Sequence, residues 1–211
     1  MTTREIILAV GVVFCVGYGW LSIGQTAPNE RSRIYLSVAM AERGDLQIDP
    51  EVYRYGWNWD LSYKNRRFYC NKPPGSSLLG AVVYGLADAV TPDGAWSMPA
   101  LFQLMRFGVM LPLALLGFVA IRRWMEMLEI SDPVVDLASV AWMLGSAAFH
   151  YAGAFFSHHI VAVCFVVGLW LLESVRQRVV APPDGSGGHP ASGPLSMLGA
   201  GVALGLAGMT D

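Results

Sequence analysis

The sequence predicts an all-α, multi-pass membrane protein with about five transmembrane helices and one large external loop that carries short interfacial helices. Hydrophobic residues make up 54% of the 211 residues, and Asp, Glu, Lys and Arg together make up only 14%. A soluble domain of this size carries about 25% charged residues. The mean hydropathy is +0.44, and the charges are clustered so that long stretches contain none. We therefore expect the lipid bilayer to be a partner of the chain.

The composition also argues against several classes of site. The net charge is −2, and no basic tract indicates a nucleic-acid partner. The sequence has no glycine-rich nucleotide fingerprint, no Walker motif and no Cys/His spacing typical of a metal site. Its three cysteines, Cys15, Cys70 and Cys164, lack the spacing of a redox motif. The chemistry is therefore expected in the external loop and at the outer ends of the spans.

The first predicted span covers residues 6–23. These 18 residues carry no charge and follow Arg4 and Glu5. At 1.5 Å per residue, such a helix nearly crosses a hydrocarbon core of about 30 Å. We interpret it as a retained anchor and not as a signal peptide, because further apolar segments follow it and no convincing cleavage site does.

The external loop is predicted over residues 24–97. A short helix is expected over 29–43, opened by Asn29 or Pro28 and ended by Gly44. The clusters WNWD and YKNRRFY come next, and they combine aromatic with cationic residues. Such a combination is typical of a membrane–water interface.

The apolar run 76–90 is only 15 residues long and contains Asp88. It is short for a crossing, so we expect an interfacial or re-entrant helix there. Beyond it, the sequence predicts four clearer spans, and a flexible linker, APPDGSGGHPASGP, separates the last two. These spans cover residues 98–121, 134–156, 157–175 and 195–210.

The placement of arginines predicts the orientation in the membrane. If the run 76–90 does not cross, five of the arginines outside the large loop fall on one side, as the positive-inside rule expects. We therefore expect the amino terminus in the cytoplasm and the large loop outside. The arginines on which this depends are Arg4, Arg122, Arg123, Arg176 and Arg178.

Several short motifs occur in an order that resembles a known family. The segment PNERSR, with Glu30 and Arg33, follows the first span, and AERGDLQID follows at the predicted helix end. Asp60 precedes the lysine of NKPPG by twelve residues, while FSHH and GLAGMTD belong to the last two spans. Together these motifs resemble the amino-terminal part of the C-type (GT-C) bacterial membrane glycosyltransferases of glycosyltransferase family 39, the class of the protein O-mannosyltransferases and the aminoarabinose transferases.

The resemblance implies a GT-C-like helical bundle and a definite reaction. A sugar would pass from a polyprenyl-phosphate donor, with inversion, to a hydroxyl or phosphate of a lipid, glycan or protein acceptor. The reaction would take place at the extracytoplasmic face of a bacterial cytoplasmic membrane. The resemblance also implies that residues 1–211 are the amino-terminal part of a longer enzyme and are inactive alone.

The resemblance implies two kinds of site residue. Glu30 is the first candidate for the catalytic base, and Asp60 is the second. Lys72, followed by two prolines that restrict the backbone, would bind the donor phosphate, as would Arg33 and Arg106.

Plainer interpretations of these residues stay open. Glu30 would then be a carboxylate favoured by the start of a helix, and Asp60 a loop carboxylate paired with Arg66 or Arg67. Lys72 would reach from the interface towards water. Asn29 occupies the position of the base in an alignment on Gly44 and Asp45, but an amide is not a useful proton acceptor. Arg106 would likewise extend outward from the start of its span.

A second group of candidates lies at the outer ends of the last spans. His158, His159 and Asp211 are candidates for contact with a phosphate or a divalent metal, and no other cofactor is indicated. Adjacent residues on a helix point about 100° apart, so the two histidines do not readily face one metal. The alternative is that they are polar residues at the membrane boundary.

Two other functional classes compete with the enzyme. A transporter predicts ionisable residues or broken helices at the middle of the membrane in paired halves. Here the charges of the predicted spans lie near their ends, and no inverted repeat is evident. A non-catalytic membrane scaffold remains the third interpretation.

Overall fold

The computed structural model describes residues 27–91, 96–180 and 193–210, together with Glu5, Ala9 and Gly17. The expected first span, apart from Ala9 and Gly17, lies outside the described residues. Most of the predicted linker and Asp211 lie outside them as well.

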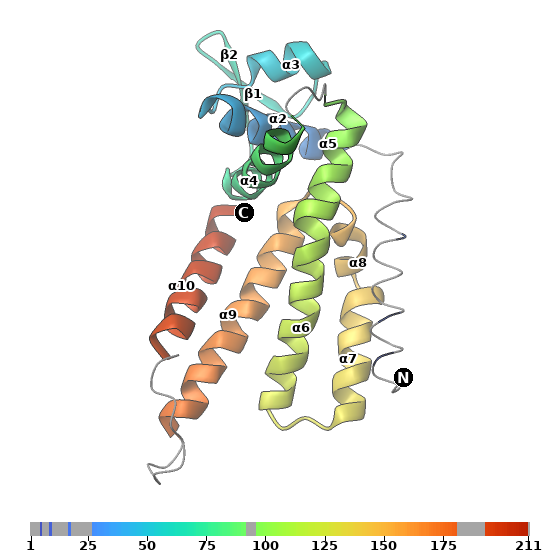
Figure 1. The fold of residues 1–211 in the computed structure, drawn as a ribbon, viewed down its shortest axis with the longest axis vertical. Coiled ribbons are helices and arrows are strands. Elements are labelled where there is room, and N and C mark those ends of the chain that lie inside the picture. Colours follow the sequence, from blue (N-terminus) through green and yellow to red (C-terminus); the bar gives the residue numbers. More distant parts are fainter. Residues whose placement is uncertain are drawn as a thin grey trace.

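The described part of the chain is mostly helical and has two parts (Figure 1). Helices α6 to α10 form a bundle along the long axis, and a cap of shorter elements lies over one end of it. Helix α5 and the π-helical turn η2 continue into α6, so they join the two parts. The cap consists of α2 (Pro28–Arg43), α3 (Asp49–Tyr55), β1 (Leu61–Lys64), β2 (Arg67–Cys70) and α4 (Gly75–Val90). The connection consists of α5 (Met98–Met105) and η2 (Arg106–Met110). The bundle consists of α6 (Leu111–Met127), α7 (Asp132–Leu144), α8 (Ala147–Ala152), α9 (Ser157–Val180) and α10 (Gly193–Thr210).

Helix α2 is the buried centre of the cap. It begins at Pro28, whose fixed φ suits the first helical position, and ends at Gly44, which has a left-handed φ of 65°. The predicted boundaries of this helix are therefore confirmed. Its middle is buried on all sides, because the eight residues 32–39 have almost no exposed surface.

The cap also contains a β-hairpin, which corrects the prediction of an all-α protein. Strands β1 and β2 pair in antiparallel register, with Tyr63 opposite Phe68. Asn65 and Arg66 have φ values of 53° and 63°, as a two-residue type I′ turn requires. The YKNRRFY cluster is this hairpin, and it lies at the side of the cap away from the bundle (Figure 1).

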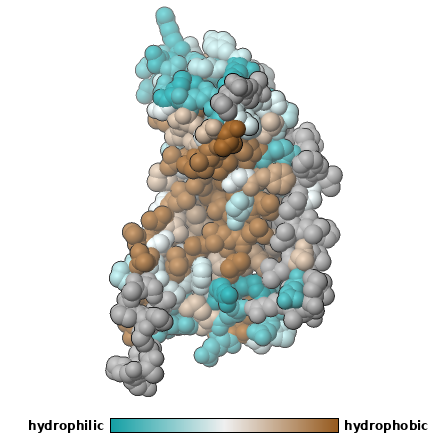
Figure 2. Space-filling view, viewed as in Figure 1, coloured by the Kyte–Doolittle hydropathy of each residue, from teal (hydrophilic) through white to brown (hydrophobic). Residues whose placement is uncertain are grey.

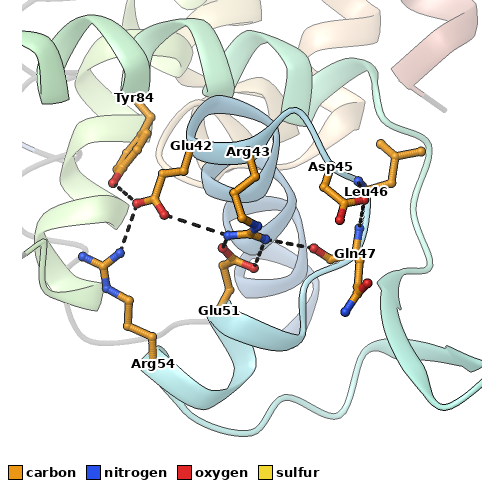
Figure 3. A network of polar contacts seen from close by, with 8 residues as sticks. All are labelled: Glu42, Arg43, Asp45, Leu46, Gln47, Glu51, Arg54 and Tyr84. Carbon is orange, nitrogen blue, oxygen red and sulfur yellow. Dashed lines mark hydrogen bonds and ion pairs between the residues drawn. The ribbon is translucent and has the colours of Figure 1, made fainter.

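A network of charges fastens α3 and α4 to the end of α2 (Figure 3). Arg43 donates two hydrogen bonds to Glu51, at 2.6 and 2.9 Å. Glu42 accepts from the Tyr84 hydroxyl at 2.6 Å and from Arg54 at 3.0 Å. These contacts join three helices of the cap, so we expect the cap to behave as one rigid unit.

Two of the described helices are long and apolar enough to cross a membrane. They are the continuous helix Met98–Met127, with 30 residues, and Ser157–Gln177, with 21 residues. Gly75–Val90 and Pro194–Thr210 are apolar but shorter. On the face drawn in Figure 2, hydrophobic residues form a broad band over the helical bundle, with hydrophilic residues at both ends.

The expected span 134–156 is two helices in the structure. Helix α7 ends at Leu144, and α8 begins after Gly145 and Ser146. The Ser146 hydroxyl oxygen accepts a hydrogen bond from the Ala148 amide at 3.1 Å, so it caps the start of α8. The apolar segment therefore changes direction where the sequence predicted a continuous helix.

The π-helical turn η2 lies just before a proline. Pro112 has no amide hydrogen to donate to the preceding turn, and Leu111 bonds back five residues to the carbonyl of Arg106. Gly108, inside this turn, packs directly against Val83 of α4, where a Cβ would collide with the valine side chain. The π turn thus lets α4 approach closely while Arg106 points into the protein.

Close packing of α4 generates a stability prediction. A Cβ on Gly80 would meet the Ser37 hydroxyl, the Met105 sulfur at 3.0 Å and the Phe155 ring at 3.1 Å, whereas a Cβ on Gly85 would meet nothing within 4 Å. We expect Gly80→Ala to destabilise the protein by about 1–3 kcal/mol through overpacking. In the same helix, Gly85→Ala should stabilise it by about 0.5–1 kcal/mol. Thermal unfolding in detergent measures both, and equal effects of the two substitutions would contradict this packing.

Candidate functional site

A buried arginine joins the cap to the bundle. Arg33 of α2 is 3% exposed, and its Nη2 donates to the Ser157 hydroxyl of α9 at 3.1 Å. Its Nη1 donates to the Ser76 hydroxyl of α4, and its Nε donates to Asn29 Oδ1 at 2.9 Å. One guanidinium therefore connects α2, α4 and α9.

Serine hydroxyls also donate hydrogen bonds to the backbone of Arg33. Its carbonyl accepts from the hydroxyls of Ser77, at 3.0 Å, and of Ser37, at 2.8 Å. Ser76 and Ser77 are fully buried, and our sequence analysis did not single them out. Their position directly after NKPPG was the available signal, because a helix that starts with two serines offers hydroxyls to a neighbouring polar group.

Glu30 lies one helical turn before Arg33 and is also buried, with 1% of its surface exposed. Its Oε1 accepts a hydrogen bond from the Phe155 amide at 2.7 Å and lies 4.0 Å from Arg106 Nη2. Burial raises the pKa of Glu30 above its ordinary value, while the Phe155 hydrogen bond and the Arg106 charge act in the opposite direction. Glu30 therefore links α2 to η2 and to the segment before α9.

Arg106 is the first residue of η2 and is 3% exposed. Its guanidinium carbon lies 5.9 Å from the ring centre of Phe102, one turn earlier. It does not extend outward, as the plainer interpretation expected. Three of the predicted site residues, Glu30, Arg33 and Arg106, thus lie together between the cap and the bundle, and we call them the boundary cluster.

Asp60 and Lys72 form a second, more exposed pair. Lys72 Nζ lies 3.2 Å from Asp60 Oδ1, which also accepts from the Asn71 amide at 2.7 Å. The other oxygen, Oδ2, is buried and has no hydrogen-bond partner in the part of the chain that the structure describes. The side chains of Lys72 and Asp60 are 26% and 20% exposed.

This pairing corrects one alternative of the sequence analysis. Asp60 was a candidate partner for Arg66 or Arg67, but the carboxylate pairs with Lys72. Arg67 instead donates to the Gln47 side-chain oxygen at 2.6 Å. The two strands and the turn between them bring residues 60 and 72 together, and the sequence analysis did not predict this hairpin.

Cys70 lies between the Asp60–Lys72 pair and the boundary cluster. Burial raises the pKa of its thiol, and the Ser32 hydroxyl and the Arg33 charge partly offset this effect. The Asp60 charge acts in the same direction as burial.

The two histidines do not share a site. His158 is exposed, and its ring lies 5.4 Å from that of Tyr151 and 6.5 Å from that of Phe156. His159 is 2% exposed and stacks on Trp142 at 6.1 Å. Within residues 27–91, 96–180 and 193–210 no group of three His, Cys, Asp or Glu side chains is arranged to hold a metal ion. Asp211, the third candidate, lies outside the described residues.

The buried carboxyl group of Glu30 generates a prediction about pH. Because the pKa in the folded state lies above the ordinary value of 4.5, the folded state binds more protons in the window between the two values. The contribution of Glu30 to stability therefore falls as pH rises from about 4.5 through the folded-state pKa.

Glu30→Gln keeps an acceptor for the Phe155 amide but cannot titrate. The stability of the natural protein relative to this variant should decrease as pH rises from 4 to 7, as measured by thermal unfolding over about that range. A relative gain in stability over the same interval would show that the ion pair with Arg106 outweighs burial.

Comparisons of the chain with known protein families, with curated proteins and with solved structures find no match. The function is therefore argued from the contacts of these residues.

Proposed function

We propose that the protein is the donor-binding part of a membrane glycosyltransferase that uses a polyprenyl-phosphate sugar. The observation that carries this proposal is the position of the cationic groups. The buried Arg33 of the cap contacts Ser157 of α9, and Arg106 lies 4.0 Å from Glu30 of the cap. Lys72 comes three residues before Gly75, which packs against Met209 and Thr210 at the end of α10. A lipid whose tail lies in the bilayer would present its phosphate at this level.

The proposal places about five spans in a bacterial cytoplasmic membrane, with the amino terminus in the cytoplasm and the cap outside. Two helices have the required length and apolar character. The distribution of charge supports this orientation, because Arg122, Arg123 and Arg176 lie near the ends of α6 and α9 that are remote from the cap. Arg122 is also paired with Asp136 at 2.6 Å.

Asp60 is the base that the contacts favour. One of its oxygens is bound by Lys72 and Asn71, while the other is without a partner among the described residues. Glu30 was our first candidate, but it is more deeply buried and already accepts the Phe155 amide. We assign Glu30 and Arg106 a positioning role, since their contacts tie α2 to η2 and to the segment before α9.

In the proposed reaction, the donor phosphate competes with Asp60 for Lys72. Once Lys72 moves to the phosphate, the Asp60 carboxylate is released to accept the proton of the acceptor hydroxyl. The acceptor oxygen attacks the anomeric carbon, and the bond from that carbon to the phosphate oxygen breaks with inversion. The polyprenyl phosphate leaves with the electron pair, and Lys72 and Arg33 stabilise its negative charge.

This competition predicts opposite effects of two substitutions on donor binding. Lys72→Met removes the cation and should weaken the binding of polyprenyl phosphate to the protein in nanodiscs. Asp60→Asn removes the competitor and should tighten binding about 2–5-fold, the range expected when a partly exposed ion pair is lost. Lys64→Met, on the exposed hairpin, is the matched control and should leave the dissociation constant unchanged. Weaker binding by Asp60→Asn would contradict the competition.

Transfer of a radiolabelled sugar from a polyprenyl-phosphate donor by the full-length enzyme, of which residues 1–211 are the proposed amino-terminal part, tests the base. Asp60→Asn should lower turnover about 10²–10⁴-fold, as is usual when a general base is lost, while donor binding is retained. If Glu30→Gln has this effect and Asp60→Asn is nearly silent, Glu30 is the base. Sugar uptake without transfer would identify a transporter, and neither activity with a folded protein would indicate a scaffold.

A further inference from the structure

The hairpin end of the cap carries a row of four aromatic rings that the proposed reaction does not use. Trp59 contacts Trp57 with ring centroids 6.1 Å apart, and Trp57 contacts Phe68 at 5.4 Å. Phe68 contacts Tyr63 at 5.1 Å. We call these four residues the aromatic row.

Most of the aromatic row faces solvent. Trp59 is 85% exposed, Tyr63 65% and Trp57 52%, while Phe68 packs partly against the core of the cap. Aromatic side chains dominate burial in folded proteins when they can reach the core. Several large exposed rings in contact with one another therefore indicate an interaction surface.

The backbone that displays the row is fixed. The side chain of Asn58, between the two tryptophans, is buried and donates to the Pro28 carbonyl at 2.8 Å. The Tyr35 hydroxyl donates to the Gly56 carbonyl at 2.8 Å, and the Phe68 amide donates to Asp49 at 3.1 Å. Binding of a partner to the aromatic row would therefore not cost the conformational entropy of ordering this backbone.

The hairpin beside the row is positively charged. Residues 61–70 contain Lys64, Arg66 and Arg67 and no acidic residue, and the neighbouring Asp60 is paired with Lys72. Arg66 has a φ of 63°, at a turn position where glycine is strongly preferred. The chain thus holds a cation at the tip of the hairpin in a strained backbone conformation.

We propose that the aromatic row, with Lys64 and Arg66, is a docking surface for an acidic oligosaccharide chain. Each sugar ring has a flat face of C–H groups that can stack on an aromatic ring, and its carboxylate or phosphate groups would pair with the two cations. The proposal deepens the proposed function, on which it rests, because it names the chemical class of the acceptor. The hairpin lies at the side of the cap away from the apolar bundle (Figure 1), which favours an occupant in solution over the bilayer.

Binding of three probes to the protein in nanodiscs tests the proposal. A hexamer of galacturonate should bind and quench tryptophan fluorescence, maltohexaose should bind about tenfold more weakly, and hexaglutamate should not bind. Trp59→Ala should weaken the galacturonate complex about tenfold, the scale of one lost stacking contact. Tyr53→Ala is the matched control, since Tyr53 is 84% exposed and no ring contact joins it to the row among the described residues.

Arg66→Gly separates binding from folding. Glycine relaxes the turn, so thermal stability should rise, whereas galacturonate should bind several-fold more weakly and maltohexaose unchanged. Equal binding of hexaglutamate and galacturonate, or unaltered affinity in Trp59→Ala, would overturn the proposal. Binding of polyprenyl phosphate to the same variants should be unchanged. If the lipid phosphate fails to bind while galacturonate still binds, the proposed function fails and the docking surface stands.

Discussion

The guanidinium of Arg33 is a charge removed from water at the junction of three helices, and its hydrogen bonds determine where those helices must lie. Leaving such a buried charge without partners costs about 3–5 kcal/mol. Its partners Ser76 and Ser157 come from α4 and α9, so neither helix can shift along α2 without losing one of them. Gly80 reinforces this arrangement, because α4 can approach α2 only where a side chain is missing.

The position of the proposed catalytic groups follows from this anchor. Lys72 is separated from the buried Ser76 only by Pro73, Pro74 and Gly75, and the two prolines restrict the backbone between them. Fixing the start of α4 therefore also fixes the position of Lys72. The hairpin formed by β1 and β2, which ends at Cys70, brings Asp60 next to Lys72. The rigid turn in NKPPG thus connects the buried Arg33 to the Asp60–Lys72 ion pair.

The parts of the fold that the sequence predicted depend on local chemistry. Proline and glycine define both ends of α2, and the long apolar segments predict the helices of the bundle. The hairpin was missed because Arg66 occupies a turn position where glycine usually gives the signal. The break of the expected span 134–156 depends on Ser146, whose capping bond competes with helix continuation over a short apolar stretch.

Candidate residues were easier to predict than their contacts. The contact of Glu30 with the Phe155 amide joins residues 125 positions apart, and no spacing rule predicts such a pair. The sequence indicated that the adjacent His158 and His159 do not readily face one metal, but only the structure shows that one lies on the surface and the other against Trp142. Burial also distinguishes Glu30 from Asp60 as a base, and burial depends on tertiary packing.

Photochemical cross-linking tests most directly the claim that a lipid phosphate binds beneath the cap. A polyprenyl phosphate with a diazirine beside the phosphate is activated with the protein in nanodiscs, and the modified peptides are identified by mass spectrometry. The account predicts labelling within residues 58–77 or 153–159, which contain the Asp60–Lys72 pair and the partners of the boundary cluster. Labelling at the opposite end of the bundle, around residues 128–131, or evenly along the apolar helices, would contradict it.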